Sequence, residues 1–304
     1  MDGRLRRWAG RAPPGEVTVF RRLFERRGRA GSPEAMPASA ASRTPQGEIV
    51  YAIGDIHGRY DLLSPLLDAI VAEADAAAGR TKVVFLGDYV DRGPDSNKVL
   101  QRLVEMRAQR EVEAIFLVGN HDEMLLKFLK DPAAGPVWAG FGGRQTLISY
   151  GVQPPNGRDA EAWTEASEAL AAAVPEAHRL LLEDAAESVI IGDYFFAHAG
   201  ARPGIPLERQ VRSDLLWIRE AFLEDATPFD KVVVHGHTPA EAIHADGRRI
   251  GLDTGAYATG VLSAAKLWAD QRSFLQAAAV ANQPLRVLVR RASTGLDEPS
   301  AAES

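Results

Sequence analysis

One stretch of the sequence, residues 83–93, limits the fold of the chain more than any other. Its first four residues, Val-Val-Phe-Leu, are apolar and two are β-branched, which is typical of a short strand buried on both faces. The run ends at Gly87 in a loop that carries Asp88, Asp91 and Arg92. In open α/β sheets, residues just beyond the carboxyl end of a strand line the ligand crevice. Alone, the stretch is equally consistent with a reaction centre and with a surface turn rich in Asp and Gly.

The same arrangement occurs twice more in the sequence. An apolar run at residues 49–53 leads into Gly-Asp-Ile-His-Gly, and another at 114–118 leads into Gly-Asn-His-Asp-Glu. Asp, His and Asn side chains supply the oxygen and nitrogen atoms that hold Mn, Fe or Zn, and glycine permits the sharp turn that keeps the backbone clear of an ion. Because three such strand ends are expected to meet at one edge of a sheet, they predict a metal cluster rather than three unrelated turns.

The periodicity of the remaining chain predicts an α/β fold. Helical patterns of apolar residues follow the three runs in turn, at 62–71, 94–106 and 124–129. A helix between two buried strands indicates a βαβ unit, so we expect a mostly parallel inner sheet. Residues 131–187 are expected to form a helical insertion that covers one rim of the cleft.

The second half of the chain is predicted to be rich in strands. The expected strands lie at residues 189–191, 194–197, 231–234, 249–255 and 261–267, with one or two more between 274 and 290. They predict a second, mixed sheet packed on the first. The expected architecture is a four-layer α/β/β/α sandwich of two mixed β-sheets flanked by helices.

The expected domain organisation is one catalytic domain over residues 47–292, with a tail at 1–46 and a disordered end at 293–304. Ten arginines and four acidic residues within 1–45 give a formal charge of +6, although the whole chain has a net charge of −6. The second half of the tail, rich in Ala, Ser and Pro, is typical of a disordered linker. Residues 17–27 mix apolar residues with arginine, which suits an anionic membrane surface or a partner protein; a solvated arm is the preferred interpretation.

The composition excludes several kinds of site. The 304 residues contain no cysteine, so disulfides, thiolate metal ligands and a cysteine nucleophile are ruled out. This suits the cytoplasm, where we expect the protein to act. No apolar run approaches the roughly 18 residues of a membrane span, and the N-terminus lacks the apolar core of a signal peptide. The acidic body of the chain argues against nucleic acid as its main partner.

Five motifs together resemble those of the calcineurin-like metallophosphoesterases. They are Gly-Asp-x-His-Gly at 54–58, Gly-Asp-x-x-Asp-Arg-Gly at 87–93, Gly-Asn-His at 119–121, His-Ala-Gly at 198–200 and Gly-His-Thr-Pro at 236–239. Their order is that of the family, and they cover roughly residues 49–265. The Asp-Arg-Gly form is similar to the phosphoprotein phosphatase branch, which includes bacterial and bacteriophage lambda Ser/Thr phosphatases.

The resemblance implies a role for each motif residue. Asp55 and His57 would hold a first metal ion, Asp88 would bridge both ions, and the ligands of the second would be Asn120, His198 and His237. The pair of divalent ions is expected to be Mn²⁺, with Fe or Zn as alternatives, and to generate a bridging hydroxide as the nucleophile. His235 is expected to lie beside the ligands and support them without binding a metal ion.

The resemblance also implies residues for proton transfer and phosphate binding. His121 would be the general acid, and Asp91 would orient its ring. Arg92 and Arg219, the latter in a Leu-Leu-Trp-Ile-Arg segment, would hold the substrate phosphate, because a guanidinium fork matches phosphate geometry. His178 and His244 belong to no motif and are expected at the surface.

One residue departs from the phosphatase pattern. Asp122 follows Gly-Asn-His at the position where the phosphoprotein phosphatases usually have Glu. An Asp here is closer to the symmetrical diadenosine tetraphosphate hydrolases. Those hydrolases, however, lack the counterpart of Asp91. We therefore expect a phosphomonoesterase acting on phosphoserine or phosphothreonine of a protein, with dinucleoside polyphosphate hydrolysis as the alternative. A pseudoenzyme that only binds phosphoproteins is disfavoured, because every expected ligand is present.

Overall fold

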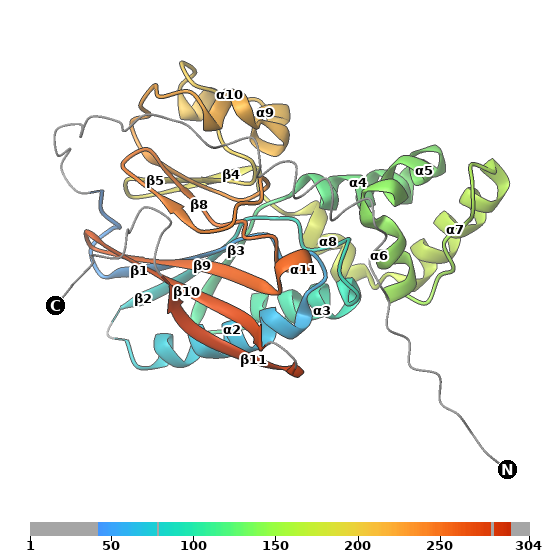
Figure 1. The fold of residues 1–304 in the computed structure, drawn as a ribbon, viewed down its shortest axis with the longest axis horizontal. Helices are drawn as coiled ribbons and strands as arrows, with labels where there is room; N and C mark the ends of the chain where they lie inside the picture. Colours follow the sequence, from blue (N-terminus) through green and yellow to red (C-terminus); the bar gives the residue numbers. More distant parts are fainter. Residues whose placement is uncertain (1–41, 78, 281–282, 293–304) are drawn as a thin grey trace, which may run out of the picture. The chain divides into compact units, whose positions relative to one another are not determined.

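Two mixed β-sheets packed face to face organise the residues that the computed structural model describes, namely 42–77, 79–280 and 283–292 (Figure 1). The six-stranded sheet has the order β11-β10-β9-β1-β2-β3. Its strands are β1 (Glu48–Ile53), β2 (Arg80–Phe85), β3 (Val112–Phe116), β9 (Val261–Trp268), β10 (Gln271–Val280) and β11 (Gln283–Ala292). The five-stranded sheet has the order β4-β5-β6-β8-β7. Its strands are β4 (Ser188–Ile191), β5 (Tyr194–Ala197), β6 (Val232–His235), β7 (His244–Ala245) and β8 (Arg249–Gly251).

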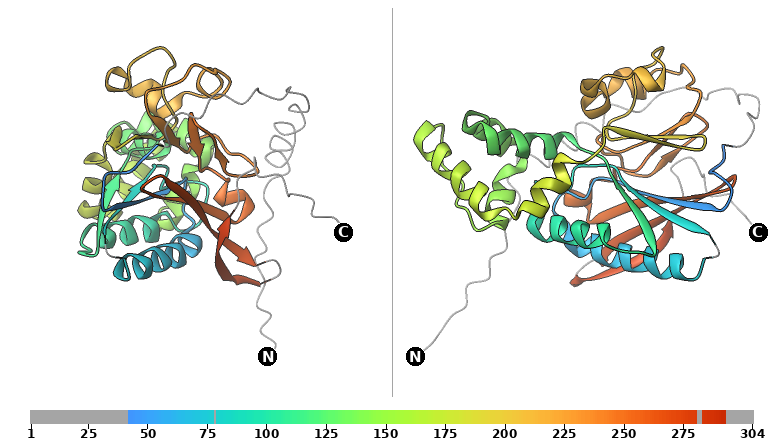
Figure 2. Two further views of the ribbon diagram at one scale, coloured as in Figure 1. Left: turned by 90° about the vertical axis from the view of Figure 1, so that its left-hand side faces the viewer. Right: turned by 180° about the vertical axis from the view of Figure 1, so that it is seen from behind.

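Helices cover the outer face of each sheet, which gives the expected four layers (Figure 2). Against the six-stranded sheet lie α2 (Tyr60–Asp75) and α3 (Ser96–Arg107). Beyond the five-stranded sheet lie η3 (Leu207–Arg209), α9 (Arg212–Trp217) and α10 (Glu220–Leu223). A short helix, α11 (Ala256–Thr259), precedes β9. The predicted α/β/β/α sandwich is therefore confirmed.

Three apolar cores hold the layers together. Leu62, Leu66 and Ile70, spaced along one face of α2, are fully buried against the first sheet. Between the sheets, alternate residues of the strands meet, such as Val84 from β2 and Val234 from β6. A third core joins the second sheet to α9 and α10. The strand β2 contributes to two of these cores, which explains why its sequence is a continuous apolar run rather than an alternating one.

The segment between β3 and β4 is helical. It contains α4 (Asn120–Lys130), η1 (Pro132–Ala134), α5 (Gly135–Trp138), the π-helical turn η2 (Ala139–Gly143), α6 (Arg144–Ser149), α7 (Ala160–Ala173) and α8 (Glu176–Glu183). The helices α4 to α7 extend to one side of the two sheets (Figure 1). Trp138 and Trp163 from this segment pack on Phe128 of α4, which ties the segment to the main core.

The pairing of the first sheet differs from the sequence expectation. The strands β1, β2 and β3 are parallel, as the βαβ pattern predicts. However, β9 pairs antiparallel with β1, and β10 and β11 continue antiparallel from it, so the sheet is mixed rather than mostly parallel. The strands expected at 261–267 and within 274–290, as parts of the second sheet, thus extend the first as β9, β10 and β11. An apolar strand pattern fixes which residues face a core but does not encode its pairing partner.

Parts of the expected tails lie outside the described residues. These are residues 1–41, with the arginine-rich segment 17–27, and residues 293–304. Thr44, close to the expected domain boundary, is buried, and its backbone N–H donates to the carbonyl of Ala269 at 3.0 Å. Among the described residues, no helix is both long enough and apolar enough to cross a bilayer.

Candidate metal centre

The predicted site residues meet at the carboxyl ends of the strands. The loops after β1, β2 and β3 and those after β5 and β6 carry them, so both sheets contribute to one centre. Two groups of metal-capable side chains lie there, each with its ligand atoms within 4.8 Å of one another. They are His57, Asp88 and His121 in the first group, and Asp88, His198 and His237 in the second. Asp88 belongs to both groups, as expected for a residue between two ions.

The backbone around this centre is strained. Among the described residues, six that are not glycine have positive φ, and five of these lie in the motifs. The five are His57 (45°), Asp88 (54°), Asp91 (71°), Arg92 (67°) and His237 (64°). Such a conformation costs of order 1–3 kcal/mol for a residue with a side chain, and it persists where surrounding contacts enforce it. Concentration of strain in the motif loops marks this region as the functional one.

Glycines in the motifs allow the loops to approach one another. A Cβ atom at Gly119 would collide with the backbone and the carboxylate of Asp88, and one at Gly236 would collide with the carboxylate of Asp55. The sequence pattern of a glycine beside each polar residue therefore has a steric cause. It lets segments far apart in the chain bring their side chains to one point.

In the first group, His57 points a nitrogen lone pair at a carboxylate. Its Nδ1 lies 2.9 Å from the carbonyl oxygen of Val90, which can only accept, so the proton is on Nδ1. Its Nε2 lies 3.4 Å from Oδ2 of Asp88. Burial, and next the charge of Arg92, lower the pKa of His57 well below its usual value, so the ring is neutral. Two electron-rich atoms thus face each other without a proton between them.

Beside the second group, the amide oxygen of Asn120 faces the lone pair of His198 at shorter range, and it can accept a hydrogen bond from the ring of His237. Nε2 of His198 lies 2.9 Å from Oδ1 of Asn120, and Nδ1 of His237 lies 2.8 Å from the same oxygen. Since Nδ1 of His198 faces the carbonyl oxygen of Leu86 at 2.9 Å, its Nε2 carries the lone pair. Burial lowers the pKa of His198, and it lowers that of His237 to about 2. Nε2 of His237 is buried without a hydrogen-bond partner in the described residues.

A divalent cation fits this donor set. Neutral imidazoles, an amide oxygen and a carboxylate direct their lone pairs toward common points. These lone pairs repel one another unless a positive charge lies between them. At Asp88, burial alone would raise the carboxyl pKa, but the nearby imidazoles, His198 foremost, favour the carboxylate over the acid and lower it, so the side chain shared by the two groups is an anion. The residues present therefore fit a pair of metal ions.

Asp55 lies beside the centre but outside both groups. Both of its carboxylate oxygens accept from the backbone N–H of His237, at 3.1 and 3.0 Å. Burial, followed by the negative charges of Asp253 and Asp88, raises the pKa of Asp55 well above its usual value. Asp253, whose pKa burial raises to about 6, is a buried carboxyl of this centre that the sequence reasoning missed. It lies in Asp-Thr-Gly after β8, another strand end followed by a polar residue and glycine, so the same rule could have found it.

His121 and Asp91 form the expected pair. Nδ1 of His121 lies 2.8 Å from Oδ2 of Asp91, and both side chains are buried. Burial alone would lower the pKa of His121, but the charge of Asp88 and the hydrogen bond to Asp91 outweigh it, so the pKa is raised. Nε2 of His121, on the far side of the ring, lies 3.0 Å from Nη2 of Arg92. The lone pair of Nε2 therefore accepts a hydrogen bond from the guanidinium in this arrangement.

The helical segment after α4 holds Asp91 in place. The indole N–H of Trp138 donates to Oδ2 of Asp91 at 2.9 Å, and the hydroxyl of Thr146 donates to Oδ1 at 2.7 Å. The backbone N–H of Asp91 donates to Thr146 Oγ1 at 3.0 Å and to Ser96 Oγ at 3.1 Å. Trp138, Thr146 and Ser96 were missed by sequence reasoning, because Trp138 and Thr146 lie 47 and 55 residues from Asp91 and Ser96 was assigned to the helix after the motif. The segment expected to cover one rim thus supplies three hydrogen bonds to the Asp91 backbone and carboxylate.

Asp122, the departure from the phosphatase pattern, joins two of the motif loops. Its Oδ2 accepts from the backbone N–H groups of Asp88 at 2.8 Å and Gly119 at 3.0 Å, and its Oδ1 accepts from Tyr89 N–H at 3.0 Å. Burial and the charge of Asp88 raise the pKa of Asp122 to about 7 despite these donors. The acidic residue at this position is therefore an anchor for the loop after β2 rather than a group facing the centre.

The two predicted phosphate-binding arginines differ in their surroundings. The guanidinium of Arg92 lies 4.6 Å from the ring centroid of Tyr257, and Tyr257 also packs edge-on against His57 at 5.4 Å. Arg219 is exposed, and after burial and His198 its charge is a further cause of the lowered pKa of His237. Arg219 therefore lies on the side of the second group, and Arg92 on the side of the first.

His235 does not belong to either group. It is buried, with Nδ1 3.1 Å from the carbonyl oxygen of Gly236, and its ring packs edge-on against Phe222. Burial, and then the charge of Arg249, lower its pKa to about 3. His235 thus supports the loop after β6, which leaves His237 as the histidine of that motif at the centre.

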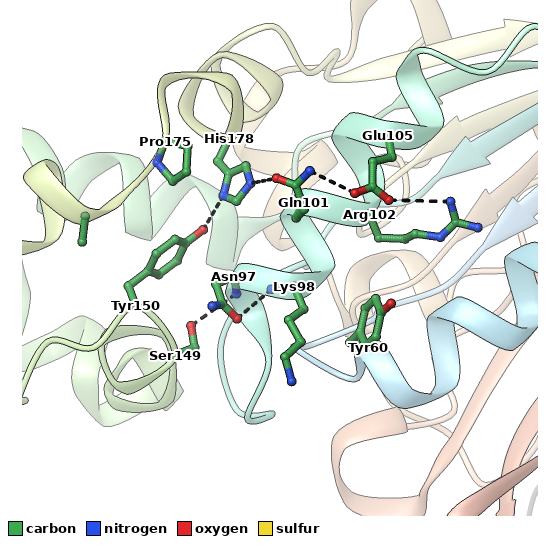
Figure 3. A pocket seen from close by; sticks show the side chains of 11 residues that line it. Tyr60, Asn97, Lys98, Gln101, Arg102, Glu105, Ser149, Tyr150, Pro175 and His178 are labelled. Atoms are coloured by element: carbon green, nitrogen blue, oxygen red, sulfur yellow. Dashed lines mark hydrogen bonds and ion pairs between the residues drawn. The ribbon is translucent and has the colours of Figure 1, made fainter.

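A pocket of about 460 Å³ lies apart from the centre, between α3, α6 and α8, and contains none of the predicted site residues (Figure 3). His178, expected at the surface, is buried on its wall. Its Nδ1 lies 2.9 Å from the hydroxyl of Tyr150 and its Nε2 lies 3.2 Å from the amide oxygen of Gln101. The expectation for His178 was wrong because its helix face packs on α3. His244, which is half-buried, pairs with Asp246 at 2.9 Å.

Comparisons of the sequence with known proteins agree with this geometry. A family model for the calcineurin-like phosphoesterases matches residues 49–260. The chain is 28% identical, over 234 residues, to the asymmetrical bis(5'-nucleosyl)-tetraphosphatase PrpE of Anoxybacillus flavithermus, a match that covers 70% of this chain and 87% of the relative. A shorter match, 42% identical over 76 residues, covers 25% of this chain and 25% of the symmetrical bis(5'-nucleosyl)-tetraphosphatase of Cellvibrio japonicus.

Solved structures share the fold. A crystal structure assigned provisionally as a diadenosine tetraphosphatase has a TM-score of 0.52 and 21% identity. The match covers 84% of this chain and 100% of that chain. The cold-active protein-tyrosine phosphatase of a psychrophilic Shewanella species has a TM-score of 0.50 and 16% identity, and the match covers 85% of this chain and 86% of that chain. Both carry the arrangement of two sheets between helices described above.

Proposed function

The chain belongs to the calcineurin-like phosphoesterase family, and from this premise we propose that it is a dinuclear metal-dependent hydrolase of dinucleoside polyphosphates. The observation that carries the hydrolase assignment is the pair of ligand groups that share Asp88. Each group brings metal-capable side chains to one point; His121, a member of the first group, also pairs with Asp91, and Arg92 lies beside it. A phosphoryl group needs this combination, because its charge must be neutralised and its leaving oxygen protonated.

We assign the metal ligands as the sequence motifs suggest. Asp55 and His57 would hold one ion, Asp88 would bridge, and the ligands of the other would be Asn120, His198 and His237. Two bound divalent ions would supply positive charge for the phosphoryl oxygens and lower the pKa of a water molecule so that it can attack near neutral pH. Oxygen and nitrogen ligands without thiolate favour Mn²⁺, with Fe or Zn as alternatives.

His121 would deliver the proton to the leaving oxygen from Nε2. Asp91, held by Trp138 and Thr146, keeps the ring oriented through Nδ1 and stabilises its protonated form. Arg92 now donates to the same Nε2 at 3.0 Å, so an incoming phosphate that draws the guanidinium away would free Nε2 for this task. Arg92 and Arg219 would bind the phosphoryl oxygens from the two sides of the centre.

The substrate class rests on the relatives. The relative that matches over 87% of its own length is named an asymmetrical bis(5'-nucleosyl)-tetraphosphatase. Asp122 is the form expected of the symmetrical hydrolases, one of which matches over a shorter segment. A serine/threonine protein phosphatase is the second candidate, favoured by Asp91. Its carboxylate polarises His121, and a strong general acid matters most when the leaving group is a basic alkoxide, as in phosphoserine.

Three further expectations remain part of the proposal. We expect the protein to be catalytic rather than a phosphoprotein-binding pseudoenzyme, because every residue expected as a ligand is present in the sequence. We expect it to act in the cytoplasm, since it contains no cysteine. Residues 1–46 and 293–304 would be tails of a single catalytic domain at 47–292, and the arginine-rich tail would offer weak contact to an anionic membrane or partner.

A substrate panel tests the proposal directly. Metal-free protein is reconstituted with Mn²⁺, Fe²⁺ or Zn²⁺ and assayed on diadenosine tetraphosphate, a phosphoserine peptide and 4-nitrophenyl phosphate. We expect activity to vanish on chelation, to return best with Mn²⁺, and to give the highest kcat/KM on the dinucleotide. A higher kcat/KM on the phosphopeptide would favour the second candidate, and full turnover in metal-free protein would refute the dinuclear mechanism.

A further inference from the structure

Trp217 presents a large aromatic surface to solvent beside the candidate metal centre. In α9 and the residue after it, Leu215, Leu216 and Ile218 are buried, with exposed fractions of 3%, 0% and 6%, whereas 42% of Trp217 is exposed. Its ring centroid lies 6.3 Å from that of His237, at an interplanar angle of 79°. An indole in this position contributes little to the core, and its ring packs edge-on against a predicted metal ligand, His237.

The edge of the indole lies against an ion-pair network. Its Nε1–H donates to Oε2 of Glu123 at 3.5 Å, and the other oxygen of Glu123 accepts from Nε of Arg212 at 2.8 Å. Arg212 also donates to Glu187 at 2.8 Å, so the glutamate is itself fixed by an ion-pair network. Glu123 lies in the first turn of α4, two residues after His121. The network therefore borders the edge of the ring and leaves much of its surface exposed.

We infer that Trp217 is a platform on which a nucleobase of the substrate stacks. A nucleobase is flat and has polar edges. It therefore suits the flat face of an indole bordered by a charged network better than an aliphatic ligand group does. Arg219, two residues further and exposed, lies on the same side of the centre and would hold the phosphate chain between the base and the metal ions. The choice of ligand rests on the proposed function.

The inference predicts a contribution of the base to binding that disappears with the indole. Stacking of a base on an aromatic side chain corresponds to about a 5- to 150-fold change in affinity. Adenosine 5'-tetraphosphate should therefore inhibit hydrolysis of 4-nitrophenyl phosphate with a Ki that is lower by about this factor than the Ki of inorganic tetrapolyphosphate, which has the same number of phosphates and no base. In Trp217→Ala the two Ki values should become similar.

Three further variants make the test specific. Trp217→Phe should keep most of the base contribution, and Trp217→Leu, which is apolar but not aromatic, should lose it. Trp268→Ala is the matched control, because Trp268 lies at the end of β9 that pairs with Ile49, away from the motif loops, and its ratio of Ki values should stay as in the wild type. Circular dichroism and thermal unfolding check that each variant folds.

Two outcomes overturn the inference. A base contribution that persists in Trp217→Ala and Trp217→Leu would place the nucleoside elsewhere, and one retained in Trp217→Leu alone would indicate a general apolar contact of the kind that a peptide makes. Failure of the proposed function has a different signature. If the wild type does not cleave diadenosine tetraphosphate but loses its base preference on Trp217→Ala, the platform stands and the substrate assignment falls.

Discussion

Replacing Thr146 by valine would remove a hydroxyl that connects the helical insertion to the proposed general acid. Thr146 is fully buried, and its oxygen both donates to Oδ1 of Asp91 at 2.7 Å and accepts from the Asp91 backbone N–H at 3.0 Å. Valine has nearly the same shape and no hydroxyl, so the substitution deletes these bonds without opening a large cavity. The backbone N–H of Asp91 would keep Ser96 Oγ as an acceptor at 3.1 Å.

The magnitude follows from the charge of Asp91. A hydrogen bond to a charged group stabilises a protein by about 1.5–3 kcal/mol, so the free energy of unfolding should fall by that amount. Loss of a supporting bond of this kind lowers activity by about 10- to 100-fold. The effect reaches the reaction through His121, because Asp91 orients the His121 ring. Trp138 still donates to Oδ2, at 2.9 Å, which should keep the loss below that of removing Asp91 itself.

The assay compares two leaving groups. Values of kcat for phenyl phosphate, whose leaving oxygen is the more basic, should fall by about 10- to 100-fold in Thr146→Val, and those for 4-nitrophenyl phosphate should fall much less. Thr146→Ser keeps the hydroxyl and should retain the wild-type ratio of the two rates. An equal loss for both esters, or no loss in Thr146→Val, would refute the idea that this bond serves proton transfer.

Three other predictions concern the acid, the anchor and the tail. In His121→Asn, kcat for phenyl phosphate should fall by about 10² to 10⁴, the usual worth of general acid catalysis, while elemental analysis still finds both metal ions; loss of an ion would make His121 a ligand. Asp122→Asn should lower the free energy of unfolding by about 1–3 kcal/mol in chemical denaturation, because one of its two acceptor oxygens becomes a donor that faces a backbone N–H; an unchanged value would contradict the anchor role. Deletion of residues 1–41 should leave turnover of 4-nitrophenyl phosphate nearly unchanged, and a folded but inactive deletion variant would refute the solvated-arm interpretation.

Sequence reasoning located the centre because its signal is local. Each motif lies within a few residues of one apolar run, and parallel strands bring their carboxyl ends together, so Asp88, Asn120 and His57 could be expected at one edge. The strain at these residues follows from the same crowding, although backbone angles cannot be read from a sequence. The strands and the helices α2 and α3 were predictable from periodic patterns, whereas no such pattern identified α9 and α10 over the second sheet.

The features that were missed depend on contacts between distant segments. Nothing in the sequence relates Trp138 or Thr146 to Asp91, which lies 47 and 55 residues away in the chain. The pairing of β9 with β1, rather than with the second sheet, depends on which strand edge is open after the other elements have packed. The burial of His178 likewise depends on the packing of α8 against α3, where a polar side chain finds two hydrogen-bond partners.

The most direct test of the dinuclear centre is the metal content of Asp88→Asn. Asp88 lies between the two ligand groups, 3.4 Å from Nε2 of His57 through Oδ2 and 3.4 Å from Nε2 of His198 through Oδ1. Titration of metal-free protein with Mn²⁺, followed by calorimetry and elemental analysis, should give two ions per chain for the wild type. The variant should bind both ions more weakly, because a neutral amide replaces the anion that both share. A wild type that binds one ion, or a variant that loses only one of two, would contradict the account.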